Sequence, residues 1–322
     1  MIPNKKNFCG GAYQDWLEVK LTGSCNGKCS WCIDRGTYNP EKEASWQEIA
    51  QAAIKAKQKN IILLGGEPLL YHSLDSIITK LCISGKNVYL TTNGYYLTKE
   101  KALELLFLEG INISVHHYDF DKNEEITGLA IPKSQLLEAV HKLNMHGIVV
   151  RFNCNLIKGY IDSKKEILSY IEFAKEMGAD SVRFAELKGE SNSFVDLYKI
   201  FGDQFGINND PFKFGCVSEG IIDNMRVSFR QMCGLQNSLR PIPKNPKQYL
   251  KQVLYNDGKI YDGWQTKGGN MKTDKKVEGA GIQLGKAKKE IERLKRKIKK
   301  LQKESKEIKK ESTAISNGGC CY

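Results

Sequence analysis

The sequence predicts an α/β fold: a partial (β/α)6 barrel of the TIM type with a small irregular C-terminal extension and a basic helical tail. Six short runs rich in β-branched and aromatic residues recur along the first 200 residues, with helical patterns between them. Strands that alternate with helices form parallel βαβ units. Each run also has one polar face, whereas a closed eight-stranded barrel fills its interior with apolar side chains.

The six expected strands are, in order, Trp16–Leu21, Ile61–Leu64, Val88–Thr92, Ile111–Val115, Ile148–Cys154 and Ser181–Phe184. Helix signals lie between them. Ser45 and Glu48 have the spacing of a capping box, and an apolar stripe beginning at Ile167 ends near Gly178.

Alternation along the strands predicts a polar cavity. In the fourth run Ser114 and His116 alternate with Ile113 and Val115, and in the fifth run Asn153 lies between apolar neighbours. One apolar face for covering helices and one polar face for a cavity fit an incomplete barrel that is open enough to hold a polar ligand.

We divide the chain into a barrel core at 1–200, an extension at 201–267, a linker at 268–285 and a tail at 286–322. Prolines interrupt the extension, and Val253–Gly263 is typical of a small hairpin. In the tail, Lys286–Lys310 contains 13 Lys or Arg and 4 Glu, a net charge of +9 out of +12 for the whole chain. Its heptads favour self-association, its charge favours nucleic acid or another polyanion, and a solvated tether is the third interpretation.

Composition excludes two classes of protein, a wholly disordered chain and a membrane protein. With 322 residues, 41% hydrophobic and 27% charged, the chain is apolar enough for a sizeable core. No run approaches the roughly 20 apolar residues of a membrane span, and Met1–Gly11 has no apolar block of a secretory signal. We expect a cytoplasmic protein with no membrane partner, in which ten cysteines indicate metal or redox chemistry.

Three cysteines follow the first strand closely: Cys25, Cys29 and Cys32. Three thiolates on one loop can bind three irons of a 4Fe–4S cluster and leave the fourth iron open. A zinc knuckle is the alternative, but zinc prefers four ligands, and no fourth ligand follows at a useful spacing.

Two further motifs end the second and third strands. Gly65, Gly66, Glu67 and Pro68 form a glycine turn with a carboxylate, and Thr91–Gly94 supplies Thr92 and Asn93. Ligands of parallel barrels bind at the C-terminal ends of the strands, where both motifs and the cysteine loop should meet.

Together the three motifs resemble the radical S-adenosylmethionine (radical SAM) superfamily, over about Trp16–Leu187. The resemblance implies that the three cysteines hold the cluster and that S-adenosylmethionine chelates its open iron. It places the amino group of the cofactor at Gly65–Pro68 and its adenine near Trp31. Thr92 and Asn93 complete the implied cofactor site.

A softer similarity points to the branch that contains GTP 3′,8-cyclase and peptide-modifying enzymes. It implies that Ser114, Asn153 and Lys158 lie near the ribose or carboxylate of the cofactor and that Arg183 lies near ligand or substrate. The chain departs from that branch because Cys216 and Cys233 stand alone, without a CxxC pair for an auxiliary cluster, and the cyclase's arginine-rich stretch is absent. We leave Cys216, Cys233, Cys320 and Cys321 unassigned.

The implied activity is reductive cleavage of S-adenosylmethionine and hydrogen abstraction from an unidentified substrate, with a peptide or protein side chain as the leading class. A nucleoside or RNA is the second interpretation, favoured by the basic tail. A non-catalytic iron–sulfur or zinc protein that binds nucleic acid is the third. The resemblance also implies an electron donor such as flavodoxin or ferredoxin.

Overall fold

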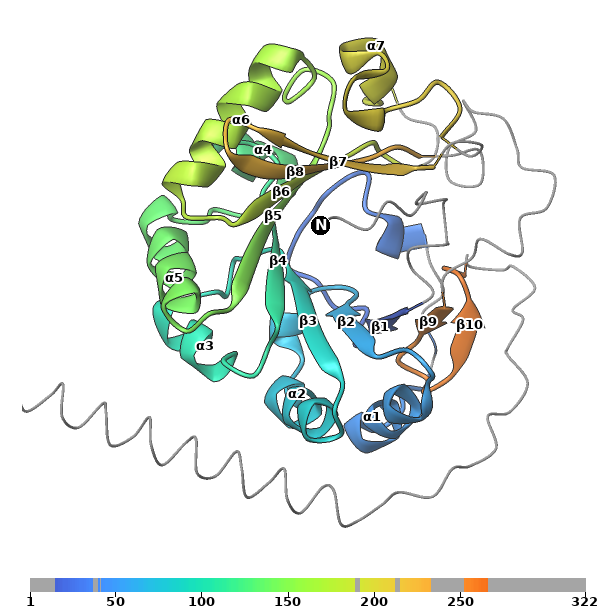
Figure 1. Ribbon diagram of the computed structural model, residues 1–322. Coiled ribbons are helices and arrows are strands. Elements are labelled where there is room, and N and C mark those ends of the chain that lie inside the picture. Colours follow the sequence, from blue (N-terminus) through green and yellow to red (C-terminus); the bar gives the residue numbers. More distant parts are fainter. Residues whose placement is uncertain are drawn as a thin grey trace, which may run out of the picture. The chain divides into compact units, whose positions relative to one another are not determined.

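The computed structural model describes residues 15–36, 40, 42–188, 192–211, 215–232 and 252–265. Their strands form one ten-stranded sheet in the order β10-β9-β1-β2-β3-β4-β5-β6-β8-β7. From β1 to β6 the neighbours are consecutive and parallel. Figure 1 shows these strands as an arc with the helices on its outer side, which is the expected partial barrel.

The six expected strands are confirmed to within one residue at each end. They are β1 Trp16–Lys20, β2 Asn60–Leu64, β3 Asn87–Thr92, β4 Gly110–Ser114, β5 Val149–Asn155 and β6 Ser181–Ala185. The described part of the chain adds β7 Val217–Ile222, β8 Met225–Arg230, β9 Gln252–Leu254 and β10 Ile260–Asp262.

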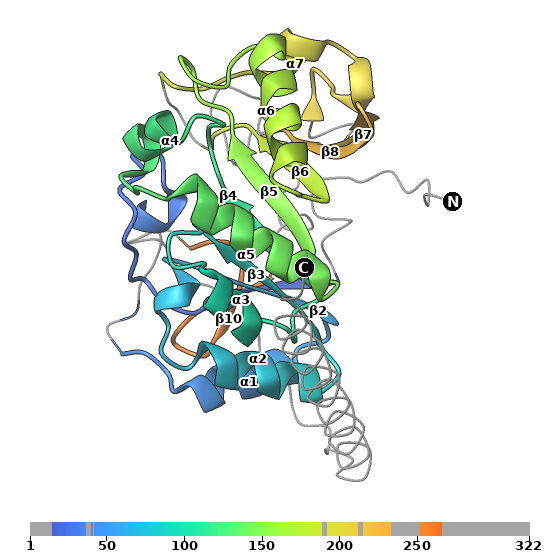
Figure 2. The ribbon, with the colours of Figure 1, turned by 90° about the vertical axis from the view of Figure 1, so that its left-hand side faces the viewer.

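Helices lie between the strands and cover the convex face of the sheet, as the side view in Figure 2 also shows. They are α1 Trp46–Lys55, α2 Leu74–Ile83, α3 Lys99–Glu104, α4 Phe120–Thr127, α5 Lys133–Met145, α6 Lys164–Glu176 and α7 Leu197–Phe201, with short 3₁₀ turns η1 Ile33–Gly36, η2 Pro68–Leu70 and η3 Gln204–Gly206. The capping box of α1 is present, with Ser45 and Glu48 each accepting from the other's backbone N–H.

The two faces of the sheet differ as the alternation predicts. Leu63, Ile113, Phe152 and Phe184 are fully buried beneath the helices in one large apolar cluster. Burying such a side chain stabilises the fold by about 1.5–3 kcal/mol. The alternate residues point to the concave face, so polar groups collect there.

The described part of the extension is more regular than the sequence predicts. The hairpin β7–β8 pairs through β8 with β6 in parallel, and the expected hairpin at 253–263 pairs through β9 with β1. Asp223 (φ 47°) and Asn224 (φ 63°) connect β7 to β8, as a two-residue type I′ turn requires. Each hairpin thus lengthens one edge of the barrel sheet.

The linker, the tail, Cys233, Cys320 and Cys321 lie outside the described residues, and so do the interpretations that rest on them. Among the residues with a described structure, no helix has the length and apolar character to cross a membrane.

Candidate active site

The cysteine loop, residues 21–32, connects β1 to η1 and lies across the C-terminal ends of the strands. Two neighbouring segments hold its backbone in place. The Glu67 N–H donates to the Ser24 carbonyl at 2.8 Å, and the Lys28 N–H donates to the Thr127 carbonyl at 2.7 Å. The loop is therefore fixed between the glycine turn after β2 and the end of α4.

A buried ion pair adds a third attachment. Lys20 is fully buried at the end of β1, and its Nζ lies 2.8 Å from Asp34 Oδ1. The other oxygen of Asp34 accepts the Gly66 N–H at 3.2 Å. One carboxylate thus joins β1, η1 and the glycine turn.

Both glycines of the turn are required by close packing. Gly65 has φ 91° and Gly66 has φ 55°, in the left-handed region that favours glycine. A Cβ on Gly66 would lie 2.2 Å from the Ser24 carbonyl oxygen, and one on Gly65 would lie 2.4 Å from Lys20 Cγ. A side chain at position 66 would push the cysteine loop away, and one at position 65 would collide with Lys20 at the end of β1.

The Glu67 carboxylate is directed into its own chain. It accepts hydrogen bonds from the Leu69 N–H at 3.0 Å, the Thr92 hydroxyl at 2.6 Å and the Asn93 N–H at 2.7 Å. The side chain is fully buried, and that burial raises the pKa of its carboxyl group against the opposing effect of the three donors. Glu67 therefore fixes the end of β3 to the glycine turn.

The three thiols lie close enough to influence one another. Burial, reinforced by the neighbouring Cys32 and Cys25, raises the pKa of Cys29 to about 11. Burial is also the main cause that raises the pKa of Cys25, whose Sγ accepts the Gly27 N–H at 3.3 Å. A raised pKa favours the neutral thiol. Iron binding would favour the thiolate instead, because the thiolate is the form of cysteine that binds metal.

The donor set fits an iron–sulfur cluster. Within the described residues, no three His, Cys, Asp or Glu side chains converge closely enough to hold a single metal ion. A 4Fe–4S cluster binds each thiolate at a different iron, so its sulfur ligands stand apart. Soft thiolates from Cys25, Cys29 and Cys32 on one wall of a pocket suit such a cluster.

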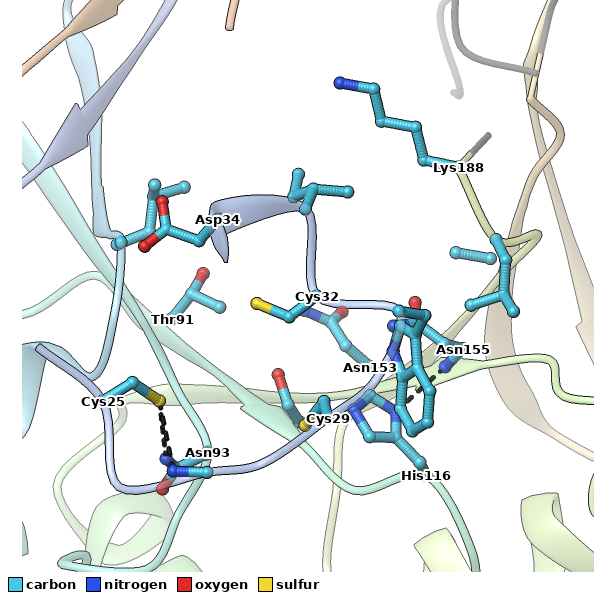
Figure 3. A pocket seen from close by; sticks show the side chains of 18 of the residues that line it. Cys25, Cys29, Cys32, Asp34, Thr91, Asn93, His116, Asn153, Asn155 and Lys188 are labelled. Carbon is cyan, nitrogen blue, oxygen red and sulfur yellow. Dashed lines mark hydrogen bonds between the residues drawn. The ribbon is translucent and has the colours of Figure 1, made fainter. Parts of the chain in front are cut away.

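That pocket has a volume of about 470 Å³ (Figure 3). Its lining includes most of the residues expected from the sequence, namely Cys25, Cys29, Trp31, Cys32, Gly65, Gly66, Glu67, Thr92, Asn93, Ser114, Asn153 and Arg183. Pro68 is buried at the start of η2, and Lys158 is exposed; neither lines the pocket.

Two amides in the pocket differ in their partners. Asn93 Nδ2 donates to Asn26 Oδ1 at 2.8 Å, which connects the end of β3 to the cysteine loop. Asn153 Oδ1 on β5 is buried and has no hydrogen-bond partner in the described structure. A buried acceptor that lines a pocket without a partner is suited to an amino or hydroxyl donor of a ligand.

His116 was not assigned from the sequence, yet it lines the pocket and is almost fully buried. Its Nδ1 accepts the Asn155 N–H at 3.1 Å, so the ring proton of the neutral form lies on Nε2. Burial lowers the pKa of His116 to about 4. Its ring meets Trp31 edge to face at 5.7 Å, and Figure 3 shows His116 close to Asn155.

The strand alternation contains the signal that would have identified His116, because it shares a face with Ser114, as Asn155 does with Asn153. Other pocket residues have no such local signal. Asp34 is held at the site by its contacts with Lys20 and Gly66, and Arg230 comes from the unexpected strand β8.

Comparison with known proteins agrees with this geometry. A family model described as the radical SAM superfamily matches residues 19–184, more than half of the chain. The GTP 3′,8-cyclase of Aquifex aeolicus (strain VF5) is 29% identical over 252 residues, which cover 75% of this chain and 71% of that enzyme. The GTP 3′,8-cyclase of Aliarcobacter butzleri (strain RM4018) is 30% identical over 218 residues, with 63% and 62% covered, so this chain spans less than two thirds of that relative.

Among solved structures, Streptococcus suis SuiB bound to S-adenosylmethionine is similar with a TM-score of 0.54 and 16% identity. The likeness covers 77% of this chain and 60% of SuiB, and it shows a shared fold. The family match extends from β1 to β6 and includes the cysteine loop, the glycine turn and the polar strand ends. This chain therefore belongs to the radical SAM superfamily, as an enzyme that uses a 4Fe–4S cluster and S-adenosylmethionine.

Proposed function

We propose that the 470 Å³ pocket holds both S-adenosylmethionine and a substrate from which a hydrogen atom is removed. The observation that supports this most is the convergence of the cysteine loop, the glycine turn and the polar ends of β3, β4 and β5 on one cavity. When bound, the reduced cluster supplies the electron that splits the cofactor into methionine and a 5′-deoxyadenosyl radical.

The chain's own residues bind and orient the reactants in this proposal. Cys25, Cys29 and Cys32 hold the cluster as thiolates. The unpartnered Oδ1 of Asn153 accepts a hydrogen bond from the cofactor, and Trp31, packed edge to face on His116, provides an aromatic surface for its adenine.

Apolar side chains complete the pocket. Leu129 and Leu187 line it and are almost fully buried, and Trp31 packs against the small apolar cluster that contains Leu187. Such a lining limits the access of water to a reactive intermediate, which suits radical chemistry.

Two substrate classes follow from different observations. We keep a peptide or protein side chain as the leading class, on the resemblance to the branch that includes peptide-modifying enzymes. A nucleotide is the second class, favoured by roughly 30% identity to proteins named GTP 3′,8-cyclase. The chain lacks the arginine-rich stretch expected of the cyclase, so GTP cyclisation itself is not proposed.

Deuterium transfer distinguishes the two classes. The reconstituted full-length protein is incubated without oxygen with a reductant, S-adenosylmethionine and either deuterated peptides or deuterated nucleotides. The proposal predicts deuterium in 5′-deoxyadenosine from one class, detected by mass spectrometry. Cofactor cleavage with no transfer from any peptide or nucleotide would contradict both substrate assignments.

A pair of variants tests the cofactor contacts. Asn153→Ala should weaken S-adenosylmethionine binding about tenfold, since it removes one hydrogen bond in a buried site. Lys158→Ala is the matched comparison, because the family resemblance places Lys158 at the cofactor while its side chain is exposed and outside the pocket. Equal affinity of Asn153→Ala and wild type would remove Asn153 from the site.

Radical SAM chemistry needs a one-electron reductant. We propose a flavodoxin or ferredoxin for this role and keep the cytoplasmic location predicted from the sequence. Reduction of the reconstituted protein by purified flavodoxin, followed by absorbance, tests the pairing.

A further inference from the structure

One end of the pocket collects positive side chains that the proposed chemistry does not use. Arg183, Lys188 and Arg230 all line this end, which is formed by β6, the segment after it and β8. The cysteine loop and the glycine turn line the other side. In Figure 3, Lys188 extends over the pocket across from Cys25 and Asn93.

The pairing of β6 with β8 explains how these cations come together. Ala185 on β6 is paired with Arg230 on β8, and Arg183 is paired with Ser228. Alternation directs Val227 and Phe229 into the apolar cluster, so Ser228 and Arg230 belong to the concave face. The small side chain of Ala185 leaves room beside Arg230, and Lys188 follows three residues later.

Two carboxylates that line the same pocket, Glu186 and Glu18, also make structural hydrogen bonds. Glu186 accepts the Leu197 N–H at 2.9 Å and the Met232 N–H at 2.7 Å. Glu18, across the pocket on β1, accepts the Trp264 indole N–H at 2.6 Å. These contacts hold α7 and the two C-terminal hairpins against the barrel.

Lys188 stands out among these charged groups. Its ammonium has neither a hydrogen bond nor a salt bridge to any residue of the described structure. Partial burial is the main cause that lowers its pKa, and the charge of Arg230 lowers it further, while Glu18 acts in the opposite direction. Two cations that repel each other in a partly buried site are stabilised by an anion that binds both.

We propose that Lys188 and Arg230 bind an anionic oxygen group of the substrate, a carboxylate or a phosphate. This inference rests on the proposed function, because it assigns the rest of the pocket to the cofactor. Arginine presents a planar fork to such a group and lysine a point charge, and both hydrogen bonds are charge-assisted. The anion would anchor the substrate on the β6–β8 side, with its reactive part directed toward the cysteine loop.

The test measures protection of Lys188 from acylation. Full-length reconstituted protein, saturated with S-adenosylmethionine, is treated with an amine-acylating reagent, and peptide mass spectrometry follows Lys188 while phosphate or acetate is added. The exposed helix residue Lys199 of α7, outside the pocket lining, would be followed in the same digest as an internal reference. We expect added anion to slow acylation of Lys188 at least fivefold, with no change at Lys199.

Two arginines on the same strand provide matched variants. Arg230→Gln should raise the anion concentration needed for half-protection about tenfold, because a charge-assisted hydrogen bond is lost. Arg226→Gln, on β8 but exposed and outside the pocket lining, should leave it unchanged. If Arg230→Gln does not fold, Lys188→Met takes its place. Its affinity for phosphate is then compared with that of wild type by calorimetry.

Each outcome decides the proposal. Protection by phosphate alone or acetate alone identifies the anionic group, and protection by both supports the shared chemistry. No protection by either anion, or equal protection in Arg230→Gln and wild type, overturns it. Protection that appears only in a parallel sample without S-adenosylmethionine also overturns it, because the cations would then belong to the cofactor. Production of 5′-deoxyadenosine in the same samples tests the proposed function separately.

Discussion

At the scale of single residues, Glu67 is the clearest case of a motif carboxylate whose contacts lie within its own chain. Glu67→Gln replaces one acceptor oxygen by an NH₂ group that must face the Asn93 N–H or the Leu69 N–H. We expect a loss of about 1–3 kcal/mol in the free energy of unfolding, because a buried donor is left unsatisfied. Denaturant unfolding of the protein before reconstitution measures it.

The control is Glu138→Gln on the exposed face of α5, which should change stability by less than about 0.5 kcal/mol. If the Glu67 variant were as stable as this control, the carboxylate could not be what fixes β3 to the glycine turn.

His116 gives a prediction about pH. Its folded pKa of about 4 lies below the ordinary value of 6.5, so the unfolded chain takes up a proton first as pH falls. The contribution of neutral His116 is therefore fully present above about pH 6.5 and declines toward pH 4. Between pH 6.5 and pH 5 the protein should lose about 2 kcal/mol of its free energy of unfolding through this titration.

His116→Asn keeps an acceptor for the Asn155 N–H and removes the titration. The stability curves of wild type and His116→Asn should converge as pH is lowered, because only the wild type carries the imidazole whose pKa is lowered by burial. Parallel curves for His116→Asn would show that the imidazole does not stay neutral in the fold.

Single residues also mark the limit of what the sequence could predict at the site. Ser114 and Asn153 follow from strand alternation and family resemblance, Arg183 follows from the resemblance alone, and all three line the pocket. The role of Asp34 in holding the cysteine loop could not be predicted from the sequence. It depends on an ion pair with buried Lys20, 14 positions earlier in the chain. Ion pairs of this kind are set by tertiary packing, and no local pattern encodes them.

At the scale of elements, β8 closes one side of the pocket and is held by aromatic packing. Phe229 is fully buried, with ring centroids of Phe184, Phe201 and Phe205 at 5.9, 5.1 and 5.7 Å. Phe229→Ala should destabilise the fold by about 3–5 kcal/mol, since it leaves a cavity between β6, β8 and α7.

Phe107→Ala is the matched control, because Phe107 is 40% exposed; its loss should cost about 1 kcal/mol or less. Urea unfolding of both variants compares them. A small effect of Phe229→Ala would mean that the β7–β8 hairpin is not part of the cooperative core.

The six barrel strands were predictable because each lies between clear helix patterns, and tertiary structure did not override their periodicity. The β7–β8 hairpin was missed although its signal is present. Met225, Val227 and Phe229 alternate with polar residues directly after Asp223 and Asn224, which form the turn. Its parallel pairing with β6 was not predictable, because only the assembled sheet provides that partner.

At the scale of the whole molecule, the role of the basic tail, residues 286–322, is the main open question. Truncation after Lys276 should preserve 5′-deoxyadenosine formation, because the pocket residues all precede it.

If the tail binds a polyanion, truncation removes RNA binding that is steeply salt-dependent. If its heptads drive self-association, truncation converts a dimer to a monomer with little salt dependence. One sizing column and one salt titration separate the two, and loss of 5′-deoxyadenosine formation would contradict the independence of the barrel.

The central claim is that Cys25, Cys29 and Cys32 hold the cluster that cleaves S-adenosylmethionine in this pocket. The most direct measurement compares wild type with a variant in which all three are alanine, after reconstitution without oxygen, for iron content and for 5′-deoxyadenosine formed with a strong reductant. We predict about four irons per chain and cofactor cleavage in wild type, and neither in the variant. A variant that kept the iron, or a wild-type protein with a full cluster that never formed 5′-deoxyadenosine, would contradict this account.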